Sequence, residues 1–146
     1  MIRKYADTDC DEVIEAWYAA SMVATPFLSE EFISEERGNI RTKWLPMAET
    51  WVSEFDGKVA GFISLIGNEV GATFVHPDYQ GRGIGRELMD HAASLRDQLF
   101  LDVFEENEIG RRFYDRYGFQ FESKHVHDDT GFMQLRLSYN PNGIKS

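Results

Sequence analysis

A glycine-rich segment near the middle of the chain carries the strongest chemical signal in the sequence. Residues 80–86 read QGRGIGR and lie between a predicted strand and a predicted helix. Glycine has no Cβ, so three glycines at alternate positions let the backbone turn tightly and approach a ligand closely. The N–H groups of such a loop, with the positive end of the helix dipole behind them, form a site for a phosphate or pyrophosphate.

Two familiar phosphate-binding loops do not match this segment. The dinucleotide fingerprint G-x-G-x-x-G would need a glycine where Arg86 stands. The Walker motif would need Gly-Lys followed by Ser or Thr, which the segment lacks. The remaining alternative is a helix start that is glycine-rich by chance, and three glycines within five residues argue against it.

The elements around the loop predict a mixed sheet flanked by helices. Hydrophobic residues recur with a helical period after Thr8 and after Ser29, and we expect Thr8 to cap the first of these helices. The dipeptides Asp56-Gly57 and Gly67-Asn68 predict turns that join three antiparallel strands. The strands are expected at residues 2–5, 50–55, 59–66, 69–75, 99–104, 119–124 and 132–137, and two later helices at 85–97 and 107–117. This order indicates a largely antiparallel seven-stranded sheet with about four helices, in the α/β (α+β) class.

With a second segment, the loop resembles a known family signature. Gln80, Gly83 and Gly85 fit the pattern Gln/Arg-x-x-Gly-x-Gly/Ala. Downstream, Asn107 is followed seven residues later by Tyr114, within an Asn…Phe-Tyr…Gly-Phe arrangement. In both segments the chain resembles the GCN5-related N-acetyltransferases (GNAT), of the small single-domain bacterial type.

The resemblance covers essentially the whole chain and implies its domain organisation. Residues 1–146 would form one acetyltransferase domain. Within it, residues 1–48 would be the helical acceptor side, 49–124 the sheet and the acetyl-CoA core, 125–139 a final strand hairpin and 140–146 a tail. One departure is Gly110, where the family usually has Ala, at a cost of about 1 kcal/mol in helix stability.

The resemblance also implies how acetyl-CoA, the co-substrate, is bound. The backbone of the loop would hold the pyrophosphate, and the strand edge before it would hydrogen-bond the pantetheine arm. A backbone N–H at or near Val75 would polarise the thioester carbonyl. The residues expected to contact the co-substrate are Phe74, Val75, Gln80, Gly81, Arg82, Gly83, Ile84, Gly85, Arg86, Asn107, Phe113 and Tyr114. Arg82 or Arg86 is expected near a phosphate, because the guanidinium fork donates to phosphate bidentately.

Two residues are candidates for acid and base in a direct attack of the amine on the thioester. Tyr114 would protonate the departing thiolate, and the alternative is a helix aromatic that packs on the sheet. Glu69 is the first choice for general base, and a surface charge at the hairpin edge is the alternative. Asn107 would contact pantetheine or only cap its helix. The turn after His127 has metal-like composition, but the reading without a metal is preferred, since a structural zinc site usually includes Cys.

Charge and composition bear on the acceptor. The net charge of −10 argues against nucleic acid and anionic membranes as partners. Residues 1–36 hold nine acids against Arg3 and Lys4, on the side where the family receives its acceptor. Aromatic side chains in the same region would line a site for a cationic, amine-bearing acceptor. The alternative is that these acidic residues only form a solvated surface. The aromatic residues expected to bind the acceptor are Trp17, Phe27, Phe32 and Trp44.

The cysteine content and the length of the apolar stretches bear on the cellular compartment. Cys10 is the one cysteine, which fits a reducing compartment. No apolar stretch reaches the length of a membrane span, and Asp7, Asp9 and Asp11 interrupt the N-terminal region where a signal peptide would have its apolar core. We therefore expect a cytoplasmic N-acetyltransferase for a small amine, an N-terminus or a protein lysine. A noncatalytic acyl-CoA sensor is the alternative function, and an exposed edge strand leaves a homodimer open.

Overall fold

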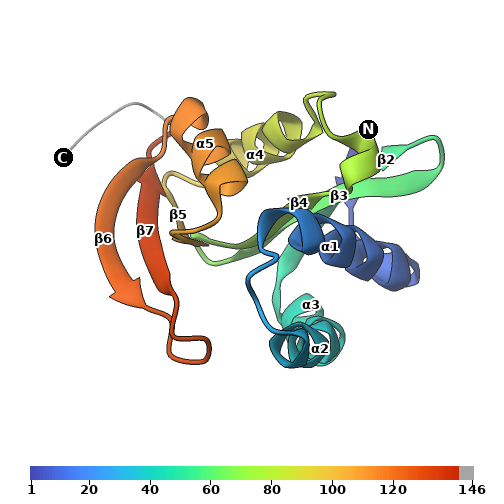
Figure 1. Ribbon diagram of the computed structural model, residues 1–146. Coiled ribbons are helices and arrows are strands. Elements are labelled where there is room, and N and C mark those ends of the chain that lie inside the picture. The colour runs from blue at the N-terminus through green and yellow to red at the C-terminus, as the bar shows by residue number, and fades with distance from the viewer. Residues whose placement is uncertain (142–146) are drawn as a thin grey trace.

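One seven-stranded sheet crosses the whole molecule (Figure 1). A computed structural model describes residues 1–141, so residues 142–146 of the predicted tail lie outside the described residues. The strand order in space is β1-β2-β3-β4-β5-β7-β6. The strands are β1 (Ile2–Lys4), β2 (Glu49–Phe55), β3 (Lys58–Ile66), β4 (Glu69–Val75), β5 (Leu99–Phe104), β6 (Gln120–Val126) and β7 (Met133–Tyr139).

The helices cover both faces of the sheet. One face carries α1 and α2, and the other carries α4 and α5 (Figure 1). Their bounds are α1 (Cys10–Ala24), α2 (Glu30–Asn39), α3 (Leu45–Met47), α4 (Ile84–Leu95) and α5 (Glu108–Tyr117). Ser29 caps α2 by accepting a hydrogen bond from the Phe32 N–H at 3.1 Å. Where Gly38-Asn39 predicts a break or kink, a π-helical turn, Ile40–Trp44, links α2 to α3.

The predicted antiparallel meander is confirmed as β2-β3-β4. Asp56 and Gly57 both have positive φ, at 53° and 75°, as a tight turn between twisted strands requires. The next pair, β4 and β5, is parallel, because the chain crosses over through the loop and α4. The last two strands pair antiparallel and complete the sheet at β6.

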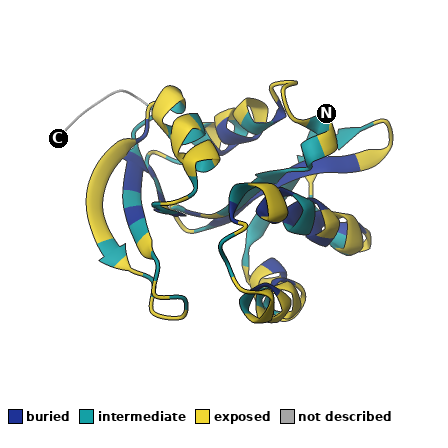
Figure 2. Ribbon diagram, viewed as in Figure 1, coloured by how far each residue is buried: buried dark blue, intermediate teal, exposed yellow. Residues whose placement is uncertain are grey.

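Two hydrophobic layers hold the helices to the sheet. On one face, Leu88 and Met89 of α4 are fully buried against Ile63 of β3. On the other face, Val13 and Trp17 of α1 pack against the same strands. The outer strand β6 stays almost wholly exposed along its length (Figure 2), because none of the helices within residues 1–141 covers it.

Several predicted boundaries need correction. Thr8 does not cap α1, since it lies inside a 3-10 turn, Asp7–Asp9. Asp9 is the residue before α1, and its carboxylate does not cap that helix but accepts the Ala6 N–H at 2.9 Å, at the start of the 3-10 turn. Helix α4 ends at Leu95 rather than at residue 97. The predicted division at residue 125 falls inside β6, so the final hairpin spans 120–139.

Candidate functional site

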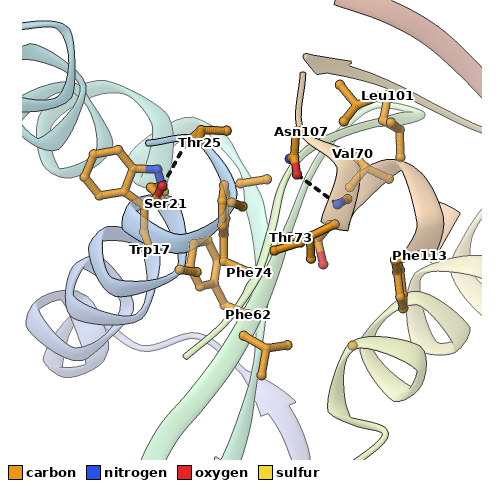
Figure 3. Close-up of a pocket in the computed structure, with 18 of the residues that line it drawn as sticks. Trp17, Ser21, Thr25, Phe62, Val70, Thr73, Phe74, Leu101, Asn107 and Phe113 are labelled. Carbon is orange, nitrogen blue, oxygen red and sulfur yellow. Dashed lines mark hydrogen bonds between the residues drawn. The ribbon is translucent and has the colours of Figure 1, made fainter. Parts of the chain in front are cut away.

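The sheet opens between its two parallel strands. Within residues 1–141, β4 and β5 are paired only at Glu69 and Phe100, where the Phe100 N–H donates to the Asn68 carbonyl at 2.9 Å. Beyond that point the strands separate, and a cavity of about 740 Å³ reaches through the opening. Figure 3 shows Trp17 and Ser21 of α1 and Thr25, the residue after α1, on one side of it and Asn107 and Phe113 on the other.

The free edge of β4 turns peptide groups into this opening. The N–H of His76 donates to the Ala60 carbonyl on β3 at 2.8 Å. Peptide groups alternate in direction along a strand, so those of Val75 point the other way, toward the opening. The Val75 carbonyl accepts a hydrogen bond from the Gln80 side chain at 3.1 Å. An extended, amide-bearing ligand arm can therefore pair with this edge as a further strand would.

The glycine loop lies at the wide end of the opening. Gly81 and Gly83 have φ of 81° and 80°, a left-handed conformation that favours glycine. Gly83 is the residue before α4, so the first N–H groups of a twelve-residue helix face the same concavity. At Gly85, an added Cβ would lie 3.3 Å from the Phe113 ring, so this glycine lets α4 pack closely on α5. The loop fits a pyrophosphate, and Gln80, Gly81, Gly83, Ile84 and Gly85 all line the cavity.

The two arginines of the loop differ in position. Arg86 lines the cavity, and its guanidinium lies 5.7 Å from the centroid of the Tyr117 ring. Arg82 does not line it and instead packs over the Phe55 ring at 4.9 Å. Arg116 of α5 also lines the cavity. The local positive charge for a phosphate thus comes from Arg86 and Arg116.

The start of α5 borders the narrow part of the cavity. The Asn107 side chain caps the helix by accepting the Gly110 N–H at 2.8 Å. An added Cβ at Gly110 would lie only 2.7 Å from Asn107 Nδ2. Glycine at this position therefore leaves room for the Asn107 amide, which lines the cavity beside Phe113.

Tyr114 brings a phenol to the cavity from α5. Its ring packs against Phe113 and Phe119, with centroids 5.5 and 5.6 Å away. Burial raises the pKa of the phenol above its ordinary value. The side chain therefore stays protonated at neutral pH and keeps its O–H available as a hydrogen-bond donor in the cavity.

The family follows from comparison with known proteins. The model of the acetyltransferase (GNAT) domain matches residues 46–121, which is more than half of the chain. The chain belongs to the GNAT acetyltransferase family. This confirms the predicted family, fold class and enzyme class: the protein is an acetyltransferase that uses acetyl-CoA.

Several relatives match this GNAT chain over nearly its whole length. Peptidyl-lysine N-acetyltransferase YjaB of Escherichia coli (strain K12) is 34% identical over 142 residues, or 94% of this chain and 95% of that one. Peptidyl-lysine N-acetyltransferase YiaC of the same strain is 30% identical over 131 residues, 89% and 90% of the two chains. The solution structure of apo YjaB has a TM-score of 0.86, with 32% identity over 95% of this chain and 96% of that one. The structure of PaiA N-acetyltransferase from Thermoplasma acidophilum in complex with coenzyme A has the same fold, with a TM-score of 0.77 and 23% identity over 95% and 98% of the two chains.

Part of this cavity lies on the α1–α2 face of the GNAT sheet. Three of the residues predicted to bind an acceptor, Trp17, Phe32 and Trp44, line the cavity there, and Glu36 lines it beside them. The ammonium group of Lys43 lies 4.6 Å from the Trp44 ring centroid. Phe27 does not line the cavity. Its ring packs edge-on against Phe132 at 4.8 Å and also contacts Phe104, so it joins the α1–α2 loop to the last hairpin.

Glu69 does not line the cavity, although its neighbour Val70 does. Both of its carboxylate oxygens accept hydrogen bonds from the Arg136 guanidinium, one of them at 3.0 Å. The structure therefore does not bring Glu69 together with Tyr114 as the base hypothesis requires. A carboxylate with both oxygens engaged by Arg has little capacity left for a proton from a substrate.

Some cavity residues were missed by the sequence analysis. Asp102, His127 and Gln134 line the cavity from β5, the last turn and β7. A usable signal exists for Asp102, since β5 reads LFLDVF and alternation puts Asp102 on the face opposite the buried Leu101. Among residues 1–141, no cluster of three or more His, Cys, Asp and Glu is placed to hold a metal ion. Within the same residues, no helix is long and apolar enough to cross a membrane.

Proposed function

We propose that this protein acetylates the side-chain amine of lysine residues in proteins or peptides. The observation that carries the proposal is the similarity to two peptidyl-lysine N-acetyltransferases over about nine-tenths of the chain. The shape of the site supports it, because the cavity passes through the sheet and opens on both faces. A long, flexible amine can enter from the α1–α2 side while acetyl-CoA lies along β4.

The cofactor half of the proposed mechanism uses backbone groups. The loop N–H groups from Gly81 to Gly85 bind the pyrophosphate, helped by the α4 dipole. The inward-facing peptide of Val75 pairs with the pantetheine arm, and an N–H at or near it donates to the thioester oxygen. Negative charge develops on that oxygen as the amine attacks, so a fixed donor there lowers the barrier.

The acid in this mechanism is Tyr114. The amine attacks the thioester directly in a ternary complex, and coenzyme A leaves as a thiolate. The buried phenol carries its proton when the thiolate forms. It hydrogen-bonds the leaving sulfur and passes that proton to it, and the phenol then regains a proton from solvent. Asn107 orients the pantetheine amide near the start of α5.

The acceptor is proposed to be cationic before it reacts. Glu36 sits on the inward stripe of α2, between the buried residues Ile33 and Ile40. Its carboxylate accepts a hydrogen bond from Asn39 at 3.2 Å and has no ion-pair partner among residues 1–141. Together with Trp17 and Trp44, it offers an ammonium ion a charge and aromatic faces.

The proposed setting is the cytoplasm, where the half-buried thiol of Cys10 would stay reduced. The exposed edge of β6 offers a second copy of the chain a strand to pair with. A homodimer would bury this edge and leave the cavity open, since β6 lies at the end of the sheet away from α1.

The experiment is a panel of acceptors with acetyl-CoA. Lysine peptides, peptides with a free N-terminus but no lysine, and spermidine are each incubated with the protein, and thiol release and product mass are measured. We expect acetylation of the lysine side chain. Turnover on spermidine alone would show that the acceptor is a small polyamine and not a protein lysine. Tight coenzyme A binding with no turnover on any amine would favour the sensor function.

A further inference from the structure

Asp102 lies on β5 just past the point where the two parallel strands separate. The last paired position is Glu69 with Phe100, and Asp102 is two residues further along the same face of β5. Its neighbours Leu101 and Val103 point into the core beneath α4 and α5. Asp102 therefore faces the α1–α2 side of the sheet, where the acceptor enters, and it lines the cavity there.

One guanidinium contacts this carboxylate through a single oxygen and leaves the other oxygen without a hydrogen bond. Arg136 of β7, directly opposite Asp102 in the ladder, donates to Asp102 Oδ1 at 3.4 Å. The same guanidinium binds both oxygens of Glu69 and lies over the Phe100 ring at 5.1 Å. Asp102 Oδ2 has no hydrogen-bond partner among residues 1–141. Two carboxylates share one cation, so the cluster keeps one net negative charge at the apex of the opening.

Asp102 and Tyr114 approach the opening from opposite faces of the sheet. Tyr114 belongs to α5 and packs with the core on the α4–α5 face. Both side chains line the one cavity that passes between β4 and β5. A thioester at the apex would then meet the incoming amine on the Asp102 side and lose its thiolate on the Tyr114 side.

We propose that Asp102 is the general base, the group that takes a proton from the acceptor ammonium before it attacks. This inference rests on the acetyl transfer to an amine proposed above. A lysine amine is protonated at neutral pH and has no lone pair until it loses a proton. Over the reaction the nitrogen loses two protons, one before the attack and one after it, and both pass through Asp102 Oδ2 to solvent. Tyr114 gives one proton to the departing thiolate and regains one from solvent, so one proton is released overall.

The surrounding charges define the setting of this carboxylate. Arg136 of β7 and Glu69 of β4 face it within the cluster. On β6, His125 hydrogen-bonds Gln134, the neighbour of Arg136 on the same face. Across the cavity stand Glu36 of α2 and His127 of the last turn, whose Nδ1 pairs with Thr130 at 2.8 Å. Glu69, with both oxygens bound, holds Arg136 so that it contacts only one oxygen of Asp102.

The test compares Asp102→Asn with the parent protein across pH, using a lysine peptide and a weakly basic amine such as hydrazine. For lysine, kcat/KM of the variant at pH 7 should fall by about 10²-fold. The loss should shrink as pH rises toward the lysine pKa, where the amine becomes neutral unaided. Hydrazine is a much weaker base than lysine and is largely neutral at pH 9, so at that pH the variant should be nearly as active on it as the parent.

Two further variants separate a base from a charge effect. Asp97→Asn removes an exposed carboxylate just before β5 and should leave both profiles unchanged. Asp102→Glu restores a carboxylate and should recover part of the lysine activity. Coenzyme A affinity by calorimetry and the thermal midpoint should match the parent in all three, which excludes misfolding as the cause.

Several outcomes would overturn the assignment. Equal losses on lysine and hydrazine, or a loss that does not shrink as pH rises, would make Asp102 a structural residue. If Glu69→Gln instead produced the lysine-specific loss, the base would be Glu69. If the parent protein itself acetylated no amine while binding coenzyme A, the proposed function would fail before Asp102 was tested.

Discussion

At the scale of single residues, the site separates two acidic side chains by environment. Tyr114 is enclosed by the aromatic rings of Phe113 and Phe119, and burial disfavours its phenolate. Asp102 is open to the cavity, and Arg136 contacts only one of its two oxygens. A buried phenol on one side and an accessible carboxylate on the other suit the roles of acid and base at one reacting bond.

Removing only the phenol oxygen tests the acid. Tyr114→Phe keeps the ring contacts with Phe113 and Phe119 but has no proton to give. We expect kcat to fall by about 10²-fold or more, with coenzyme A affinity little changed. Thiol release at saturating substrates and calorimetric titration of coenzyme A measure the two quantities.

A matched control is Tyr18→Phe, which removes a phenol oxygen from α1, outside the cavity lining. It should keep the parent kcat. An unchanged kcat in Tyr114→Phe would remove Tyr114 from the mechanism.

At the scale of elements, α5 depends on a contact between its cap and its third residue. Asn107 closes the first turn by accepting the Gly110 N–H, and a methyl group at Gly110 would press on the same amide. The departure from the family's usual Ala is therefore matched by a cap that fills the space. Local sequence alone assigns Gly110 only a helix penalty, because the position of the Asn107 side chain is a feature of the folded cap.

A double-mutant cycle measures that contact. With Asn107 present, Gly110→Ala should give little or no stabilisation, since the helix gain of about 1 kcal/mol is offset by displacement of the cap. In an Asn107→Ala background, which itself costs about 1 kcal/mol, the same change should stabilise by about 1 kcal/mol. Urea denaturation of the four proteins gives the coupling. Equal effects of Gly110→Ala in both backgrounds would show that the contact is absent.

The elements were largely predictable, but the opening between them was not. Apolar strand patterns and turn dipeptides predicted all seven strands, and helical periods predicted the helices, because each is a local signal. That β4 and β5 pair at one position and then part depends on how α4 returns the chain across the sheet, which no local pattern records. For the same reason Glu69 looked free: its partner Arg136 is 67 positions away in the chain. Phe27 likewise pairs with Phe132 of a distant hairpin instead of lining the cavity.

The first strand is tied to the start of α1 by a charged contact that makes stability depend on pH. Arg3 donates two hydrogen bonds to Asp9, at 2.8 and 2.9 Å, and these hold the pKa of Asp9 below its usual range. A carboxyl with a lowered folded-state pKa stabilises the fold above its ordinary pKa, and loses that effect as pH falls through the lowered value.

Asp9→Asn should therefore destabilise the protein at pH 7 by about 2 kcal/mol, as expected for hydrogen bonds to a charged group. The difference from the parent should shrink below about pH 4, the ordinary range of an Asp pKa, because the parent then loses the same charge. Asp7→Asn, an exposed neighbour in the same turn, is the control. A destabilisation that stays constant down to pH 2.5 would mean that shape, not charge, holds this contact.

At the scale of the whole molecule, the net charge of −10 includes carboxylates that are already bound by other groups of the protein. In the acidic N-terminal quarter, Asp9 is bound by Arg3, Asp11 by Arg41 at 2.6 Å, and Glu12 accepts the Val59 N–H. Glu36 is the one of these nine acids that lines the cavity. The long-range field of the protein and the local charge at the acceptor site are therefore two separate effects. The first acts on the approach of a cationic peptide, and the second acts on its bound amine.

Ionic strength separates the two effects. Raising salt from 0.02 to 0.2 M shortens the screening length from about 20 Å to about 7 Å, so the field stops attracting a distant cation. KM for a peptide with several lysines should then rise several-fold, with kcat unchanged, because steering affects association and not the bound complex. KM for acetyl-CoA should change much less, since salt screens both its repulsion by the net charge and its attraction to Arg86. Glu36→Gln should raise the peptide KM at both salt concentrations. If that variant raised it at low salt only, Glu36 would contribute to the field and not to the bound complex.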